Sequence, residues 1–219
     1  MYANGDARAL PQTQFILTED EYLEFERNAD VRHEYLDGHL FLMAGESDEQ
    51  ADISMNLAVL IGGQLKGTPC RARMKDTKVR SGALPRQSNS SNGLYSYPDL
   101  VVICGEPKHL DHRRDVIINP GVIIEVLSHT TEDFDRRVKF TRYRMWNDTL
   151  TDYLLVSQNQ AFVEHFLRRD DNEWVYRSYW GLEQEVPISS IACTLPLADV
   201  YDRISFPPAP DEDLEEDAQ

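Results

Sequence analysis

Apolar positions recur at helical spacing in the segment that spans residues 47–67. Ile53, Leu57 and Ile61 are four residues apart, so they lie on one side of a helix and predict its buried face. Gly67 follows this pattern as a stop signal, because glycine readily adopts the left-handed backbone conformation that ends many helices.

Two further helices are predicted elsewhere in the chain. Thr18, with Glu21 three residues later, forms a capping-box pattern, so a short amphipathic helix is expected over residues 19–28. Residues 129–148 are typical of a longer helix, and Thr131 is its candidate N-cap. These predictions place helices both before and after the most apolar part of the chain.

Short apolar or alternating runs between turn residues predict strands. They are residues 39–45 after an Asp37-Gly38 turn signal, 70–82, 97–104, 116–128, 151–158, 160–169 and 173–181. The order of helix, several strands, helix and more strands predicts an α/β domain with a mixed sheet. We expect this domain to cover residues 15–206, between a loose N-terminal arm (residues 1–14) and a disordered acidic tail (residues 207–219).

The net charge of the chain is −16, and six acids of the tail contribute −6 of it. A strongly basic surface that coats nucleic acid is therefore excluded, although a small basic groove is not. No stretch of about 18 apolar residues exists, so no membrane span is expected.

Three widely spaced cysteines and the lack of a secretory signal predict a cytoplasmic protein with reduced thiols. Cys104 and Cys193 stand beside apolar residues and are expected to fill small spaces in the core. No pair of cysteines has the close spacing of a zinc site.

Glu125 interrupts the otherwise apolar run of residues 122–127. Val, Ile and Leu occupy the other five positions, and such a run predicts a buried strand. An isolated carboxylate there would cost on the order of several kcal/mol to ionise unless another group pairs with it. The residue therefore needs a partner.

Asp99 is a candidate for that partnership, because it stands at the start of another apolar strand, 26 residues before Glu125. Two buried carboxylates repel each other, so one takes up a proton unless a cation bridges them. A magnesium ion suits this place, since it binds one or two protein carboxylates and keeps its other positions for water and phosphate oxygens. The alternatives are that Asp99 caps a turn and that Glu125 pairs with an arginine.

Lys139 and Glu34 extend this constellation. Asp135, Lys139 and Tyr143 are four residues apart and share one helix face, so the lysine can approach the carboxylates if the helix packs on the sheet. An ammonium there can orient a water or stabilise developing negative charge. Glu34 precedes a turn and could complete a metal-binding cluster. The alternatives are a solvated Asp135–Lys139 pair and a surface glutamate near Arg32.

Five blocks of the sequence, taken in order, resemble the Uma-two family of restriction-endonuclease-like proteins. This family is abundant in cyanobacteria and belongs to the PD-(D/E)xK nuclease superfamily. The blocks are RHEYLDGHLFLMAG, YPDLVV, VIIEVLS, DRRVKFTRYR and DYLLV. Each is weak alone, but their order and spacing are specific, and the likeness runs from about Thr18 to Phe206. It implies a restriction-endonuclease-like core, in which helices flank a mixed β-sheet.

The resemblance also implies a role for each matching residue. Asp99 matches the aspartate of the "PD" element and Glu125 the acid of the second element, so both are expected to bind Mg²⁺ or Mn²⁺. The general pattern has a lysine two residues after that acid, where this chain has Leu127. Lys139 matches a lysine that the family carries on the next helix instead. Glu34 matches the acid in the N-terminal part of the site and is expected as a further metal ligand.

The function implied is a magnesium-dependent endonuclease that hydrolyses phosphodiester bonds in DNA. Cleavage of a duplex needs two sites, so a homodimer formed through the aromatic C-terminal strands is expected.

Gln50 stands where the family often has a histidine, which puts a contribution from that helix to the site in doubt. The alternatives are a catalytically silent nucleic-acid- or protein-binding module and a nuclease for another nucleic acid. Candidate phosphate contacts are Lys108, Arg113, Arg114, Arg136 and Arg142.

Overall fold

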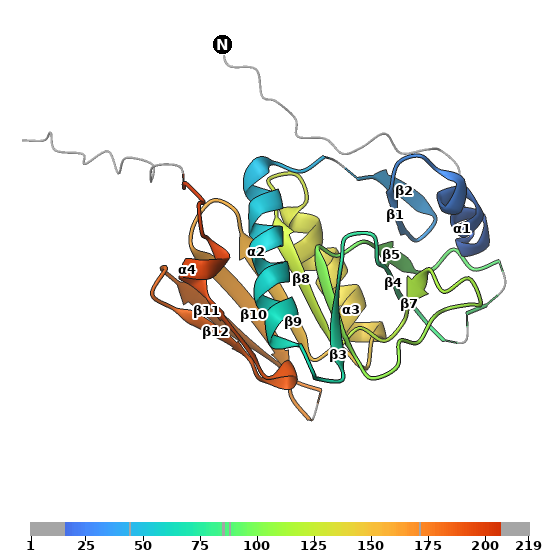
Figure 1. Ribbon diagram of the computed structural model, residues 1–219. Helices are drawn as coiled ribbons and strands as arrows, with labels where there is room; N and C mark the ends of the chain where they lie inside the picture. Colours follow the sequence, from blue (N-terminus) through green and yellow to red (C-terminus); the bar gives the residue numbers. More distant parts are fainter. Residues whose placement is uncertain (1–15, 44, 85, 88, 171, 207–219) are drawn as a thin grey trace, which may run out of the picture.

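The computed structural model describes residues 16–43, 45–84, 86–87, 89–170 and 172–206. The expected N-terminal arm and acidic tail lie outside these residues. Within the described ranges, no helix is long and apolar enough to cross a membrane. The helices and strands are arranged as mixed α/β layers (Figure 1).

The elements follow one another in a fixed order. They are α1 (Glu19–Asn28), β1 (His33–Leu36), β2 (His39–Leu42), α2 (Asp48–Gln64), β3 (Cys70–Met74), β4 (Lys78–Ser81), β5 (Leu94–Ser96), β6 (Leu100–Cys104), β7 (Val116–Ile117), β8 (Val122–Leu127), η1 (Phe134–Lys139), α3 (Phe140–Trp146), β9 (Asp152–Ser157), β10 (Phe162–Arg168), β11 (Trp174–Trp180), β12 (Glu185–Ile188), η2 (Ser189–Ile191), β13 (Cys193–Pro196) and α4 (Leu197–Val200).

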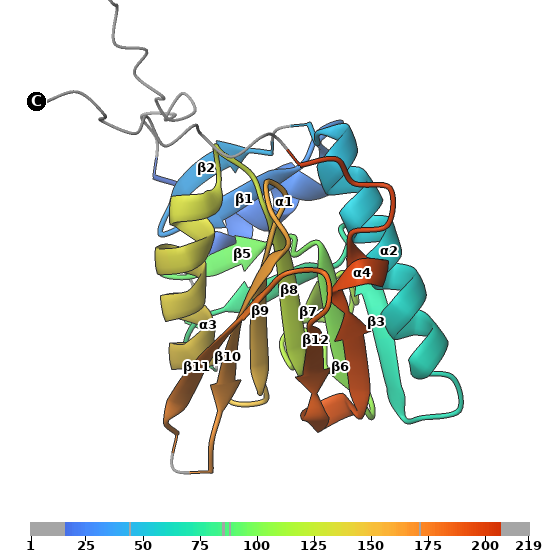
Figure 2. The same ribbon diagram turned by 90° about the vertical axis from the view of Figure 1, so that its left-hand side faces the viewer.

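A six-stranded sheet with the order β11-β10-β9-β8-β6-β3 forms the centre of the domain. Its strands β8 and β9 are parallel, whereas β6 runs antiparallel to β8. Helices α2 and α3 stand on opposite sides of this sheet (Figure 2). Each face therefore has its own apolar cluster, one with α2 and the C-terminal elements and one with α3.

A second sheet, of order β2-β1-β5-β4-β7, lies beside the first, and α1 packs on it. Tyr22 of α1 stacks on Tyr35 of β1 with 4.8 Å between ring centroids. Strand β5 ends at Ser96 and β6 begins at Leu100, so residues 97–99 connect the two sheets. This junction places Asp99 where the sheets meet.

The predicted helices are largely confirmed. Thr18 caps α1, and its hydroxyl accepts a hydrogen bond from the Glu21 amide at 3.2 Å while the Glu21 carboxylate accepts from the Thr18 amide at 2.8 Å. Helix α2 also lies where the apolar spacing predicts it. Thr131 stands directly before the first helical residue, Glu132, as predicted, but its side chain accepts no hydrogen bond from the helix and so does not cap it. The Thr131 hydroxyl instead bonds Ser128 at 2.9 Å.

Two strand predictions were too coarse. Residues 70–82 form two strands, β3 and β4, which belong to different sheets because the chain turns between Met74 and Lys78. Residues 33–42 form a hairpin of β1 and β2. Its turn places both Asp37 and Gly38 at positive φ, which is the geometry that favours an Asp-Gly pair.

The expectation of three reduced cysteines is wrong for two of them. Cys70 and Cys104 are paired residues of the antiparallel strands β3 and β6, and they form a disulfide. Cys104 is exposed and does not fill the core, because β6 ends there at the surface. Cys193 is buried with a free thiol, as expected.

Candidate active site

Asp99 and Glu125 lie beside each other across strands β6 and β8. Leu100 is paired with Ile124, and extending this register by one residue sets Asp99 against Glu125. The amide of Val126 donates a hydrogen bond of 2.6 Å to Oδ2 of Asp99. Both carboxylates are buried. The predicted neighbourhood of the two strands, with the helix that follows β8 packed on them, is confirmed.

Lys139 comes to these carboxylates from the helix that follows β8. Its Nζ lies 3.4 Å from Oε1 of Glu125, and it lies 2.9 Å from Oδ1 of Asp135 one helical turn earlier. The lysine is only 5% exposed. The alternative of a solvated surface pair is therefore wrong, and Glu125 pairs with a lysine rather than an arginine.

Glu34 completes the group from the other sheet. It lies on β1, and its Oε1 is 2.9 Å from Nζ of Lys139 and accepts a hydrogen bond of 3.3 Å from the amide of Tyr97. Glu34 is 8% exposed, so the alternative of a surface glutamate is also wrong. Four residues named from the sequence, Glu34, Asp99, Glu125 and Lys139, thus lie in one buried cluster.

Burial governs the electrostatics of this cluster. It raises the pKa of Glu34, Asp99 and Glu125, and for Glu125 the nearby charges of Asp135, Asp99 and Glu34 add to the rise. Burial alone would lower the pKa of Lys139, but the carboxylates of Asp135, Glu125 and Glu34 outweigh it and raise that pKa well above its usual value. The ammonium is therefore the stable form of Lys139.

Lys75 is a site residue that the sequence reasoning missed. It follows β3, and its Nζ lies 3.3 Å from Oδ1 of Asp99 and also contacts the carboxylate of Glu46. The signal was present, since Arg71, Arg73 and Lys75 alternate along one side of the predicted strand. Lys75 places a second ammonium at the cluster, on the side of Asp99.

Two neutral side chains hold strand β8 in place beside the carboxylates. The hydroxyl of Tyr143 lies 2.6 Å from the hydroxyl of Ser96 and 3.5 Å from Oε1 of Glu125. Gln50 of α2 donates a hydrogen bond of 3.1 Å from Nε2 to the carbonyl of Val126. Helix α2 therefore supports the site through Gln50, despite lacking the histidine that the resemblance led us to look for.

The five candidate phosphate contacts divide into two groups. Arg136 pairs with Glu132 and Glu164, and Arg142 pairs with Asp37. The other three, which are exposed and form no ion pair within the described residues, are Lys108, Arg113 and Arg114.

The carboxylates fit a small divalent ion in number and type. Asp99 and Glu125 supply the one or two oxygen ligands that Mg²⁺ takes from a protein. Among the described residues, no group of three or more His, Cys, Asp and Glu side chains is arranged to enclose a metal ion. Because Glu34 is held by Lys139, the donor set fits an open, largely hydrated ion rather than a closed protein cage.

Comparison with known proteins assigns this chain to a family. Residues 19–197 match the model of the Uma2 family, described as "Putative restriction endonuclease". The chain belongs to the Uma2 family. All four residues of the buried cluster lie within the part of the chain that matches the Uma2 model.

Two relatives of this chain come from Synechocystis sp. (strain ATCC 27184 / PCC 6803 / Kazusa). The uncharacterized protein slr1290 is 31% identical over 94% of this chain and 100% of its own. The uncharacterized protein sll1609 is 32% identical over 81% of this chain and 95% of its own. Both matches extend over nearly the whole of each relative, so they share one domain with this chain.

A solved structure shares the fold. The crystal structure of "a putative nuclease belonging to DUF820" from Anabaena variabilis ATCC 29413 has a TM-score of 0.66, with 15% identity. The match covers 84% of this chain and 97% of the other. The expected restriction-endonuclease-like fold, a mixed sheet flanked by helices, is confirmed.

Proposed function

We propose that this Uma2 protein is a metal-dependent endonuclease that hydrolyses phosphodiester bonds in DNA. The observation that carries the proposal is the convergence of Asp99, Glu125 and Lys139 in one buried group at the junction of two sheets. Buried carboxylates with raised pKa values around an ammonium are typical of catalytic sites. The family description supports a nuclease, and the DNA substrate and the metal are our inference.

Asp99 and Glu125 are the residues that would hold Mg²⁺ or Mn²⁺, with Glu34 in contact through water. When bound at such a site, the ion polarises the scissile phosphate and lowers the pKa of a coordinated water. The hydrogen bond from the Val126 amide fixes Asp99 with one oxygen, Oδ1, directed elsewhere. Lys75, which contacts that oxygen, must move for Asp99 to bind a metal.

Lys139 is the residue we assign to the transition state. Asp135 and Glu34 each hold its Nζ at 2.9 Å, so the ammonium is oriented before any substrate arrives. A preorganised positive charge in a site that excludes water stabilises negative charge that develops on the phosphate, or orients the attacking water. Tyr143 positions Glu125, since its hydroxyl lies 3.5 Å from Oε1 of that carboxylate.

The test is cleavage of supercoiled plasmid and of labelled single-stranded DNA with Mg²⁺ or Mn²⁺. We expect nicking by the wild type, no cleavage in EDTA, and no cleavage by Asp99→Asn, which keeps the side-chain size but removes the charge. Asp170→Asn, at an exposed position, is the matched control and should cut normally. Cleavage by Asp99→Asn at the wild-type rate would contradict the proposed site.

A second candidate function is a catalytically silent binding module on the same fold. The observation that favours it is the pair of lysines, Lys75 and Lys139, whose ammonium groups already neutralise the carboxylates without a metal. This candidate predicts nucleic-acid or protein binding that EDTA leaves unchanged and no cleavage of any DNA. Isothermal titration of the wild type with Mn²⁺ separates the two, because only the nuclease requires a metal at Asp99.

We also propose that two copies pair, since cutting both strands of a duplex takes two sites. Strand β11 lies at an edge of the six-stranded sheet, and Tyr176 and Trp180 are 51% and 54% exposed on it. A partner that covers this strand would bury both rings. Light scattering should give twice the chain mass for the wild type and a lower mass for Trp180→Ser.

A further inference from the structure

A row of three cations, Arg71, Arg73 and Lys75, occupies every second position along the edge strand β3 and the residue that follows it. Cys70, Ala72 and Met74 pack against the core cluster on the α2 side, so Arg71 and Arg73 project from the opposite face of the strand. Lys75 continues this alternation, and its Nζ contacts Asp99. The row therefore begins on the surface and ends at the carboxylates.

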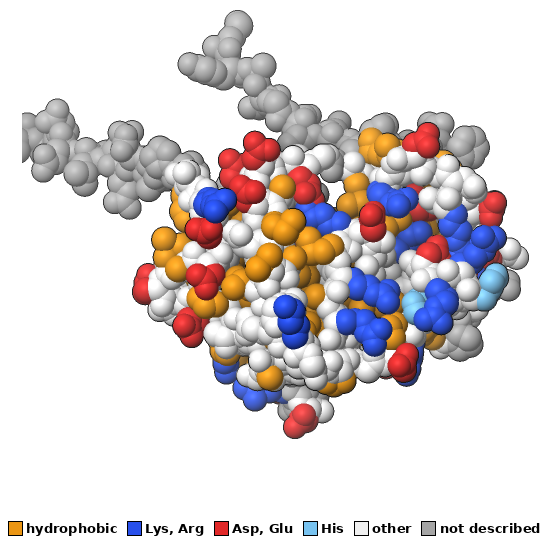
Figure 3. Space-filling view, in the orientation of Figure 1, with side chains coloured by type: hydrophobic (Ala, Val, Ile, Leu, Met, Phe, Trp, Pro, Cys, Tyr) orange, Lys and Arg blue, Asp and Glu red, His pale blue; other side chains and the backbone are white. Residues whose placement is uncertain are grey.

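The connector between β6 and β7, residues 105–115, lies beside this row. It begins next to the start of β3, where the Gly105 amide donates to the Pro69 carbonyl at 2.9 Å. Burial lowers the pKa of His109, and the positive charges of Arg114 and Arg73 lower it further, so these three side chains share one neighbourhood. Lys and Arg side chains, with histidines between them, gather on this side of the molecule (Figure 3).

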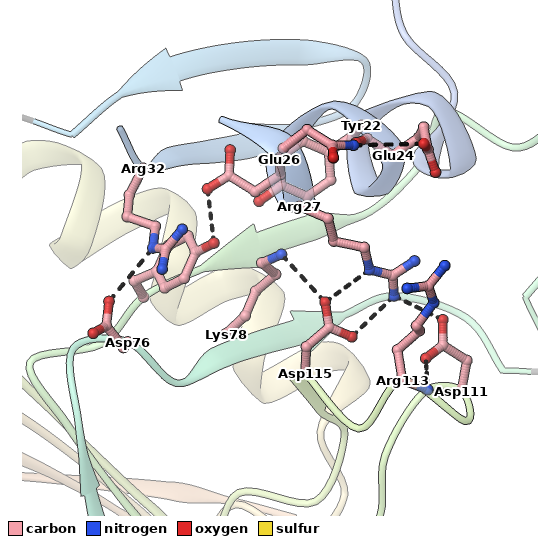
Figure 4. A network of polar contacts seen from close by, with 12 residues as sticks. Tyr22, Glu24, Glu26, Arg27, Arg32, Asp76, Lys78, Asp111, Arg113 and Asp115 are labelled. Atoms are coloured by element: carbon pink, nitrogen blue, oxygen red, sulfur yellow. Dashed lines mark hydrogen bonds and ion pairs between the residues drawn. The ribbon is translucent and has the colours of Figure 1, made fainter. Parts of the chain in front are cut away.

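Two acids of the connector, Asp111 and Asp115, do not neutralise these cations. Arg27 of α1 binds both Asp111 and Asp115 through hydrogen bonds of 2.9 Å, as Figure 4 shows. Lys78 adds its charge at 3.9 Å from Asp115. Asp111 and Asp115 are thus paired with α1 and β4, Glu106 forms no ion pair within the described residues, and the connector's own cations are left for another partner.

Within the described part of the chain, five cationic side chains of β3 and the connector form no ion pair, whereas Arg27, Arg80, Arg136 and Arg142 all pair with acids. The five are Arg71, Arg73, Lys108, Arg113 and Arg114. Unpaired cations in a chain of net charge −16 create a local positive surface against an acidic background. Such a surface attracts anions to this side of the molecule.

We infer that Arg71, Arg73, Lys75, Lys108, Arg113 and Arg114 form a basic strip that holds the phosphates of a nucleic-acid strand and leads it to Asp99. This inference rests on the proposed function, because the end of the strip is the proposed cleavage site. Side chains two residues apart on one face of a strand are about 6.6 Å apart, so the three cations from Arg71 to Lys75 span about 13 Å. That length suits a chain of successive phosphates rather than one ion.

The strip also gives Lys75 a role. A phosphate held beside Asp99 offers the Lys75 ammonium an anionic partner besides Asp99 and Glu46, so substrate binding draws Lys75 away from the carboxylate that the metal needs. Substrate binding and metal binding at Asp99 then assist each other. Lys75 is a positioning residue in this scheme, since its contact is with Asp99 and the substrate backbone.

The test measures binding separately from cleavage. Fluorescence anisotropy in EDTA follows a labelled 20-nucleotide single strand and the corresponding duplex, with Arg71→Gln/Arg73→Gln compared with Arg169→Gln/Arg203→Gln. The control pair removes the same charge from exposed positions, and Arg169 follows β10, which lies on the other side of β8 from β3 in the sheet. We expect the first pair to weaken binding about tenfold and to reduce the slope of log Kd against log salt by about 1.4 to 1.8. The control should match the wild type.

The outcomes distinguish the strip from the nuclease proposal. Weaker binding by the first pair supports the strip even if the wild type cleaves nothing, which would overturn only the proposed function. Equal binding and salt dependence for both pairs overturns the strip even if the wild type cuts DNA. Equal affinity of the wild type for polyglutamate also overturns the nucleic-acid assignment. If Arg71→Gln/Arg73→Gln does not fold, Lys108→Gln/Arg114→Gln serves in its place, because both residues are exposed.

Discussion

The Nζ of Lys139 lies 2.9 Å from Oε1 of Glu34 and joins a helix that follows β8 to a hairpin about a hundred residues earlier in the chain. Glu34 therefore does more than add a carboxylate to the site. It is a partner of the lysine besides Glu125 and Asp135, so the ammonium is held by both sheets and by its own helix. Such support is what a preorganised catalytic charge requires.

Lys139→Ala should reduce the rate of cleavage by on the order of a hundredfold or more, with kcat falling more than KM rises. It should also lower the free energy of unfolding by roughly 3–5 kcal/mol at neutral pH, because Glu34, Glu125 and Asp135 lose their buried partner. Plasmid-cleavage kinetics and urea unfolding measure the two effects. Lys66→Ala, at an exposed position two residues after α2, is the control. Full activity in Lys139→Ala would disprove the assigned role.

Leu127→Lys should partly restore cleavage to Lys139→Ala. Leu127 and Glu125 are two residues apart on β8 and share one face of the sheet, so a lysine at position 127 brings an ammonium to the same carboxylate. The recovery should be incomplete, because Leu127 packs in the core cluster beneath α3. The double variant is compared with Lys139→Ala/Leu127→Met, which restores no charge. Equal rates for the two would mean that the charge must come from the helix.

Glu125→Gln should abolish cleavage and yet stabilise the fold. Burial and three neighbouring acids raise the pKa of Glu125 in the folded chain, so its ionised form is less stable there than in the unfolded chain. That loss of stability sets in as the pH rises above the usual glutamate pKa, and the amide removes it. A gain of about 1 kcal/mol corresponds to about 2–4 °C in Tm for a chain of this size. Calorimetry at pH 7, with exposed Glu185→Gln as the control, tests the sign.

Part of this site could be predicted from the sequence, because an acid in an apolar strand is a local signal. Asp99 and Glu125 carry that signal, and the helical spacing of Lys139 places it on the correct face. Glu34 comes from the second sheet, and Lys75 comes to Asp99 because the pairing of Met74 with Leu100, extended by one residue, sets the two opposite each other. Local periodicity shows which residues share a face, but it does not show which strands pair or that residues 70–82 change sheets. It therefore missed the approach of Lys75 to Asp99.

The Cys70–Cys104 disulfide could not be predicted from the sequence for a similar reason. The two residues are 34 positions apart, and only the register of β3 against β6 sets them opposite each other. Alkylation of the unreduced, unfolded protein should modify one thiol, that of Cys193, and three after reduction. Cys104→Ser should lower the free energy of unfolding by about 3–4 kcal/mol. In a reductant, the variant and the wild type should unfold alike. Three reactive thiols without reduction would contradict the bond.

Asp152 should make the fold sensitive to acid. It is fully buried on β9, accepts a hydrogen bond from Nε2 of His165 at 2.7 Å and is also bonded by Thr151 and Ser190. Burial alone would raise its pKa, but these hydrogen bonds outweigh burial and lower the pKa below the usual value. The carboxylate therefore stabilises the fold above the unfolded pKa of about 3.9, and this contribution is lost as the pH falls through the lower folded value.

Asp152→Asn should therefore lower the free energy of unfolding by about 1–3 kcal/mol at pH 7. Urea unfolding from pH 7 down to pH 3 should show this difference shrinking below about pH 4, where the Asp152 carboxylate of the unfolded chain begins to take up a proton while that of the folded chain stays ionised. Asp170→Asn, at an exposed position, should follow the wild type throughout. A difference that stays constant down to pH 3 would mean that Asp152 acts through its shape and hydrogen bonds and not through its charge. The pairing with His165 would then be a neutral contact within the sheet.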